Sequence, residues 1–284
     1  MKFVLQLYKA QPVGVIISII YVLLALLGPL VSGQDPNRID MRYKLAPPSG
    51  THLMGTDHLG RDVASRLLHA ARTSLYVVLL AAAFCASIGV PLGLVSGFLG
   101  GGTDVVLSRV TDAMLTLPTV IVAFVMAVLL GPSLLSASLA IGMSGVPRML
   151  RVARAAALEV KAEAFVEASR ATGASTPYIL SRVVLPNALA PLIIQLTYFA
   201  PLAIMWESGL SFLGIGVQPP DPSWGVMLST AKKYLWSSPT FLVFPALAVV
   251  LSMTGLNLLG DGLRSALDPL TLTRRAKKAS REPG

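Results

Sequence analysis

Residues 13–31 read VGVIISIIYVLLALLGPLV, an apolar run without one charged side chain. At about 1.5 Å per residue, an α-helix of this length crosses the hydrocarbon core of a bilayer, which is about 30 Å thick. Lys2 and Lys9 precede the run, as basic residues precede the apolar part of a signal peptide. The run is longer than the usual apolar part of such a peptide, and no clear small-residue cleavage site follows it. We therefore interpret it as an uncleaved first membrane span.

The composition of the whole chain is typical of a membrane protein. Its 284 residues are 54% hydrophobic and 13% charged, and the mean hydropathy is +0.70. A soluble domain carries about 25% charged residues with which to cover its surface. This chain has too few, so its apolar surface needs lipid as solvent. The net charge of +9 could indicate a nucleic-acid partner, but in a membrane chain it fits better with Lys and Arg gathered in cytoplasmic loops.

Five further apolar segments follow the first span. We predict spans at Leu75–Leu99, Val105–Leu130, Leu134–Val152, Ala188–Leu210 and from Phe241 to about Gly260. Prolines lie in or beside these segments, which membranes tolerate where neighbouring helices or water satisfy the freed carbonyls. The predicted fold class is therefore an all-α integral membrane protein with about six transmembrane helices. Several bent helices favour a bundle around a path over a simple anchor.

The distribution of basic residues predicts the orientation and the parts of the chain. With both termini inside, cytoplasmic segments hold most of the 23 Lys and Arg residues, as the positive-inside rule requires. Residues 1–74 then comprise a cytoplasmic stub, the first span and an outer loop over 32–73. Residues 75–270 form the core membrane domain, with an inner loop over 153–187. Residues 271–284 form a basic cytoplasmic tail suited to anionic lipid.

The inner loop 153–187 is predicted to form a helical hairpin outside the membrane. From Ala155 to Thr172 it is rich in strong helix formers, and Gly173 is suited to a left-handed C-terminal cap. Thr176–Pro177 favours the start of a second helix, which Pro186 is expected to stop. A solvated connector is the alternative. A capped hairpin is stiff, however, and stiffness suits a part that transmits motion from a partner.

The same loop carries a motif that resembles the EAA motif of ABC-type importer permeases. That motif is E-A-A, three residues, G, nine residues and I-x-L-P, and the spacing agrees throughout. Ser169 and Val183 depart from it conservatively. The resemblance implies that the loop docks into a groove of a cytoplasmic ATPase subunit. The implied docking positions are Glu167, Ala168, Ser169, Gly173, Leu185 and Pro186.

Three other stretches resemble the dipeptide, oligopeptide and nickel branch of this family. Residues 53–63 resemble its LGTDxLGRDV stretch, residues 210–225 its SLSFLGxGVQPP…WG stretch, and residues 257–269 its NLLGDGLRxxLDP stretch. The likeness is to the second permease subunit of a peptide importer. It implies a multi-pass protein of the bacterial cytoplasmic (inner) membrane that moves dipeptides or oligopeptides by alternating access. Nickel or a nickel chelate is the alternative cargo.

The resemblance also implies the partners. These are a second homologous permease, two ATP-binding subunits, an extracytoplasmic solute-binding protein and membrane lipid. The sequence contains no Gly-Lys dipeptide and hence no P-loop. ATP and Mg²⁺ are therefore expected on the partner ATPases, with no cofactor held by this chain. No Ser-His-Asp or His-Glu-x-x-His arrangement can be assembled at credible spacing, so we expect no catalytic residues, and the three histidines fit no metal pattern.

Ionisable residues inside predicted spans are candidates for the transport path, because a charge in lipid is costly. Asp112 follows Arg109 by one helical turn, and the two are expected to neutralise each other. Glu207 lies near the outer end of the fifth span, where it either faces the pore or bonds the backbone of an outer loop. The spans are otherwise poor in carboxylates. A secondary transporter coupled to ions, the alternative class, is therefore disfavoured.

The outer loop contributes a second group of candidates. Gly55 and Gly60 flank Asp57, and Arg61-Asp62 follows, a pattern that predicts a turn entering an amphipathic helix. Asp57, Arg61 and Asp62 are candidates for gating. Mutual pairing of Arg61, Asp62 and Arg66 is an equally acceptable interpretation.

Overall fold

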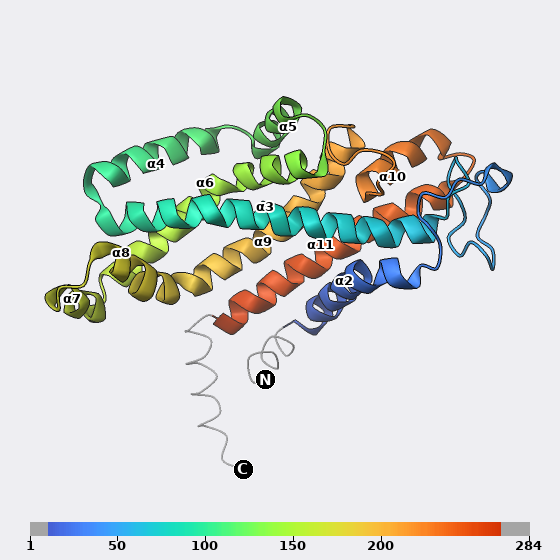
Figure 1. Ribbon diagram of the computed structural model, residues 1–284. Coiled ribbons are helices and arrows are strands. Elements are labelled where there is room, and N and C mark those ends of the chain that lie inside the picture. The colour runs from blue at the N-terminus through green and yellow to red at the C-terminus, as the bar shows by residue number, and fades with distance from the viewer. Residues whose placement is uncertain (1–10, 268–284) are drawn as a thin grey trace, which may run out of the picture.

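The computed structural model describes residues 11–267. Figure 1 shows long helices side by side, with connections at two opposite ends of the molecule and the short helix α5 part-way between them. One end, called here the loop end, carries residues 32–62 and helix α10. The other, called the hairpin end, carries helices α7 and α8. The predicted all-α class is confirmed, whereas the terminal stub over 1–10 and the basic tail over 271–284 lie outside the described residues.

The helices begin and end as follows. In chain order they are α2 (Pro12–Val31), the 3-10 turn η1 (Met41–Tyr43), α3 (Val63–Leu99), α4 (Gly101–Thr116), α5 (Thr119–Leu130), α6 (Leu134–Lys161), α7 (Ala164–Ala171), α8 (Thr176–Tyr178), the π-helical turn η2 (Ile179–Val184), α9 (Leu185–Phe212), α10 (Trp224–Ala231), the 3-10 turn η3 (Lys232–Tyr234) and α11 (Pro239–Leu267). The predicted first span corresponds to the helix α2, which is long and apolar enough to cross a membrane.

The structure has fewer uninterrupted spans than the six predicted. Within residues 11–267, 4 helices are long and apolar enough to cross a membrane, or up to 5 if a bent pair is one span. The predicted span Val105–Leu130 is that bent pair, because α4 and α5 meet at 91°. Pro118 explains the break. It disfavours helical backbone in the preceding residue, and Leu117 is extended with φ −80° and ψ 133°.

Helix α6 contains the predicted span Leu134–Val152 but is not among these apolar helices. Its serines and glycines, together with Arg148, Arg151 and Arg154, lower its hydropathy, and it continues past Val152 to Lys161. Much of α6 is nevertheless buried, because it packs against α3, α5 and α9. Neighbouring helices therefore cover much of α6, whose polar composition would not suit direct contact with lipid.

Glycines on α3 allow α6 to approach closely. Gly89, Gly93 and Gly97 recur every four residues and face α6. A Cβ placed at Gly93 would lie 2.5 Å from the Cβ of Ala153, and one at Gly97 would lie 2.9 Å from that of Ala157. Such stripes of small residues associate helices in membranes, because the backbones can pack without intervening side chains. The α3–α6 pair is the centre of the bundle.

Helix α3 also begins earlier than predicted. Its N-terminal cap is Asp62, whose Oδ2 accepts a hydrogen bond from the Ser65 backbone N–H at 2.7 Å. The expected turn into a helix after Arg61-Asp62 is therefore present, but that helix is continuous with the predicted span Leu75–Leu99. The outer loop consequently covers 32–62 rather than 32–73.

The side of the bundle formed by α2 and α11 is apolar. Its exposed side chains are Ile16, Ile19, Ile20, Leu23, Leu24 and Leu27 on α2, and Val243, Leu247, Val250 and Leu251 on α11. Apolar exposure of this extent suits contact with lipid tails.

Candidate functional site

The predicted hairpin is present at the hairpin end, in a modified form. Its first arm was expected to be one helix over 155–172, but α6 ends at Lys161 and α7 begins at Ala164. Glu163 between them is extended, with φ −78° and ψ 140°. Val166 on α7 is fully buried, as is Val184 of the π-helical turn. Helix α7 is therefore held against the second arm of the hairpin.

Gly173 ends α7 in the left-handed conformation that the sequence predicts, with φ +81°. Its backbone N–H bonds to the carbonyl of Arg170 at 2.9 Å, and that of Ala174 bonds to the carbonyl of Ser169 at 3.1 Å. This pair of bonds is the Schellman motif, in which a glycine turns the chain sharply and satisfies the last helical carbonyls. The hairpin tip thus has a defined geometry.

The second arm does not stop at Pro186 as expected. Residues Thr176–Phe212 form one continuous helical stretch, which passes through the π-helical turn before α9. There the Leu185 N–H bonds to the carbonyl of Leu180, one residue further back than in an α-helix. The wider turn shifts the bonding register next to Pro186, so the missing N–H of the proline does not end the helix. The hairpin is therefore built directly onto a candidate membrane span.

The motif positions lie mainly on the outside of the hairpin. Glu167, Ala168, Gly173 and Pro186 are exposed, and Leu185 is half-buried. Ser169 is also half-buried, and its hydroxyl donates to the Phe165 carbonyl at 2.8 Å. Beside them the aromatic side chains of Phe165 and Tyr178 are 42% and 56% exposed. The hairpin therefore presents an exposed, partly aromatic surface.

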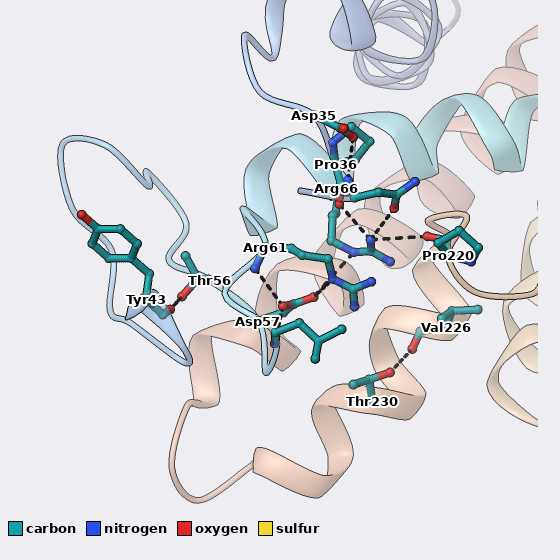
Figure 2. A network of polar contacts seen from close by, with 12 residues as sticks. Asp35, Pro36, Tyr43, Thr56, Asp57, Arg61, Arg66, Pro220, Val226 and Thr230 are labelled. Carbon is teal, nitrogen blue, oxygen red and sulfur yellow. Dashed lines mark hydrogen bonds and ion pairs between the residues drawn. The ribbon is translucent and has the colours of Figure 1, made fainter. Parts of the chain in front are cut away.

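The loop end contains a buried ion-pair network (Figure 2). Asp57 has no exposed surface, and its Oδ2 lies 2.6 Å from Nε of Arg61 and 3.8 Å from Nε of Arg66. Arg66 also donates from Nη1 to the Pro36 carbonyl at 2.9 Å and to Asn37 Oδ1 at 3.1 Å. The network joins the start of α3 to residues 36–37 and 57–61. Asp57 and Arg61 are thus bonded to each other, and their expected gating role stays a prediction.

Asp62 does not take part in the pairing with arginines that the sequence suggested. Besides capping α3, its Oδ1 lies 3.0 Å from Nδ1 of His52. The neighbouring His58 stacks on Tyr234 of η3, with ring centroids 5.7 Å apart. Burial lowers the pKa of the His58 imidazole from its ordinary value; Asp57 opposes this shift, and Arg61 and Arg66 act in the same direction as burial. His58 joins the 57–61 turn to η3 by ring stacking.

Glu207 is fully buried in a cluster of serines. Its Oε2 accepts hydrogen bonds from Ser74 of α3 at 3.1 Å and from Ser208 at 3.4 Å, and its Oε1 accepts one from Ser211 at 2.9 Å. The prediction that it either faces the pore or bonds loop backbone missed this arrangement. The carboxylate instead connects α3 with the end of α9.

The same cluster explains two of the glycines of the stretch 210–225. The Val217 N–H donates to the Ser211 hydroxyl at 3.0 Å, which folds the segment after α9 back onto it. A Cβ at Gly216 would lie 2.7 Å from the Ser211 backbone nitrogen, and one at Gly225 would lie 2.8 Å from the Ser211 Cβ. Only glycine fits at either place. Ser211 therefore links the Glu207 carboxylate to the segment that leads into α10.

Replacing Glu207 by alanine is expected to lower the apparent melting temperature of the detergent-solubilised protein by about 5–10 °C. The substitution leaves buried serine hydroxyls without their acceptor and opens a cavity. Glu207→Gln keeps a carbonyl acceptor of the same shape and should lower it by about 3 °C or less. Equal melting temperatures for Glu207→Ala and the unmodified chain would show that the serine cluster does not hold the loop end together.

The predicted pairing of Asp112 with Arg109 is wrong. Asp112 Oδ1 instead accepts a hydrogen bond from Nη2 of Arg151 on α6 at 2.7 Å. A second pair lies nearby, in which Asp104 of α4 binds Arg154 of α6 through two bonds of 2.5 Å and 2.7 Å. Helix α4 is thus attached at two points to α6, the helix that leads into the hairpin.

Comparison with known proteins gives a consistent result. The family model for the binding-protein-dependent transport system inner membrane component matches residues 89–272. The probable D,D-dipeptide transport system permease protein DdpC of Escherichia coli is 38% identical over 264 residues, which cover 92% of this chain and 89% of the relative. The di/tripeptide transport system permease protein DppC of Pseudomonas aeruginosa is 39% identical over 262 residues, which cover 90% of this chain and 86% of the relative.

A solved structure shares the fold. A chain from an inward-facing conformation of the MetNI methionine ABC transporter superposes with a TM-score of 0.58 at 19% identity, over 72% of this chain and 97% of that one. At so low an identity the likeness concerns the arrangement of helices alone.

Proposed function

The chain belongs to the family of binding-protein-dependent transport system inner membrane components, and from this we propose that it is the permease subunit of an ATP-driven importer of dipeptides or oligopeptides. It is a multi-pass membrane protein that works with other ABC components. The observation that carries the proposal is the hairpin. An exposed hairpin with the EAA positions is joined without a break to a candidate membrane span.

The energy for import is proposed to come from separate ATPase subunits, which would bind ATP and Mg²⁺. The sequence contains no P-loop of its own. Two such subunits would dock at the hairpins of this chain and of a second, homologous permease. An extracytoplasmic solute-binding protein would deliver the peptide to the loop end. The hairpin end and both termini are accordingly assigned to the cytoplasm.

Transport by alternating access requires two conformations of similar energy that the partner can bias. The hairpin suits this role because its second arm continues as α9, and its first arm follows α6. Displacement of the hairpin would therefore move both helices together. The pairs Asp104–Arg154 and Asp112–Arg151 would carry α4 with α6.

Uptake by the reconstituted complex tests the cargo. The chain is co-purified with its partner permease and ATPases, placed in proteoliposomes and supplied with the loaded binding protein. We expect ATP-dependent uptake of radiolabelled dipeptides or oligopeptides and no uptake of ⁶³Ni²⁺. Uptake of nickel without peptide would support the alternative cargo, and uptake of either without ATP would contradict an ATP-driven importer.

A further inference from the structure

A hollow of about 200 Å³ lies between helices α2, α3, α10 and α11. Aliphatic and aromatic side chains form nearly all of its lining. Two of them, Leu24 of α2 and Leu251 of α11, are also 45% and 52% exposed. Both belong to the apolar side of the bundle formed by α2 and α11. The hollow therefore opens on the side that suits contact with lipid tails.

Helix α2 is already in close contact with its neighbours on either side of the hollow. A Cβ at Gly14 would lie 2.5 Å from the Cβ of Leu258 on α11, and one at Gly28 would lie 3.0 Å from the Cβ of Leu68 on α3. The residues of α2 that line the hollow fall within 17–24, between these two glycines. A simple shift of α2 toward the bundle therefore cannot close the hollow, because the helix would collide at one contact or the other.

The polar groups in the lining do not suit the hollow to water. The Ser252 hydroxyl donates to the Ala248 carbonyl at 2.6 Å, and Nε1 of Trp224 donates to the Leu67 carbonyl at 3.2 Å. The Tyr21 hydroxyl has no hydrogen-bond partner among residues 11–267, but it is itself buried and so is closed off from the hollow. A water molecule in a cavity needs several polar partners, and apolar cavities stay dry. An empty hollow would leave its walls without contacts, so an apolar occupant fits best.

We propose that an acyl chain of a membrane phospholipid occupies this hollow and joins α2 to the rest of the bundle. The lipid belongs to the leaflet at the loop end, because Leu67 lies near the start of α3 and Trp224 begins α10. Helix α2 precedes the residues 89–272 that the family model matches, whereas α11 lies within them. The acyl chain would thus pack between an N-terminal helix and the part of the chain that the family shares.

Photolabelling in the complete complex tests the proposal. The bilayer contains phosphatidylethanolamine with a diazirine halfway along one acyl chain, and labelled residues are identified by mass spectrometry after irradiation. Trp224 and Ala71 line the hollow but are only 2% and 4% exposed, so lipid that merely surrounds the protein has little access to them. We expect label at both, together with label at Val243 on the lipid-facing side, which is 46% exposed.

Three variants make the result specific to the hollow. Ala248→Phe places a larger side chain in the lining and should remove the label from the two hollow residues, while the label at Val243 persists. Val250→Phe is the matched control, because it lies on α11, is 58% exposed and does not line the hollow. It should leave all three residues labelled. Leu251→Trp narrows the opening at an exposed position and should displace the acyl chain even if Ala248→Phe does not fold.

Three results would overturn the inference. Label at Val243 without label at Trp224 or Ala71 would show that no acyl chain enters the hollow. Label at the two hollow residues that persists in both Ala248→Phe and Leu251→Trp would show that lipid reaches them by another route. Absence of label at all three residues would show that a partner subunit covers this side. The readout requires no transport, so failure of the complex to import peptide would contradict the proposed function and leave this result unaffected.

Discussion

Replacing Asp57 by asparagine is expected to reduce strongly the yield of folded, monodisperse protein. The carboxylate has no exposed surface, and the side chains of Arg61 and Arg66 are only 10% and 2% exposed. The substitution removes the carboxylate that is bonded to Arg61 and that forms an ion pair with Arg66, while both guanidinium groups stay buried. Breaking a buried pair in this way costs about 3–5 kcal/mol, a large part of a total stability of about 5–15 kcal/mol. Size-exclusion profiles and apparent melting temperatures in detergent measure the effect.

The matched control for this experiment is Asp40→Asn. Asp40 forms an ion pair of 2.6 Å with Arg42, whose side chain is 81% exposed. Ion pairs at the surface contribute about 0–1 kcal/mol, so this variant should resemble the unmodified chain. If Asp57→Asn also had the size-exclusion profile and melting temperature of the unmodified chain, the buried network would not be needed to assemble the loop end.

Replacing Glu167 by arginine is expected to separate the ATPase subunits from the complex. Glu167 is exposed on α7 and makes no ion pair among residues 11–267, so the change should leave the fold intact. In a docked interface the reversed charge meets groups arranged for the opposite sign, which costs about 2–5 kcal/mol. We expect the co-purified ATPase, and the ATP hydrolysis that the loaded binding protein stimulates, to fall at least about tenfold.

Two further variants make this result specific to the hairpin. Gly173→Trp places a side chain at φ +81° and should distort the hairpin tip. We expect it, too, to lower the amount of co-purified ATPase. Lys233→Glu reverses an exposed charge at the loop end and should retain the ATPases. Retention of ATPase by Glu167→Arg and Gly173→Trp alike would place the docking surface elsewhere.

The sequence predicted those elements that depend on local composition or local geometry. Apolar runs identified α2 and the long parts of α3, α9 and α11, because burial in lipid needs only length and hydropathy. Gly173 was identified as a cap because a left-handed C-terminal residue is a local requirement. The glycine stripe on α3 was missed, although the spacing of Gly89, Gly93 and Gly97 is visible in the sequence and is a known signal for helix association.

Contacts between distant residues could not be predicted from one sequence. Spacing along a helix suggested Arg109 as the partner of Asp112, but Arg151, 39 residues away, is closer in space. Likewise Ser74 and Glu207 are 133 residues apart. The effect of proline was equally dependent on context. Pro118 breaks a predicted span, while Pro186, expected to end a helix, is accommodated after a π-helical turn.

Cross-linking from the hairpin to the ATPase tests whether the hairpin is the surface that binds the ATPase. The chain contains 1 cysteine, Cys85, which is buried. Ala168→Cys in a Cys85→Ala background therefore provides one accessible thiol for a short photoactivatable label in the assembled complex, and Leu53→Cys at the loop end is the control. We predict that the label at position 168 captures an ATPase subunit and that the label at position 53 does not. Capture of no ATPase from position 168, or equal capture from both positions, would contradict the account.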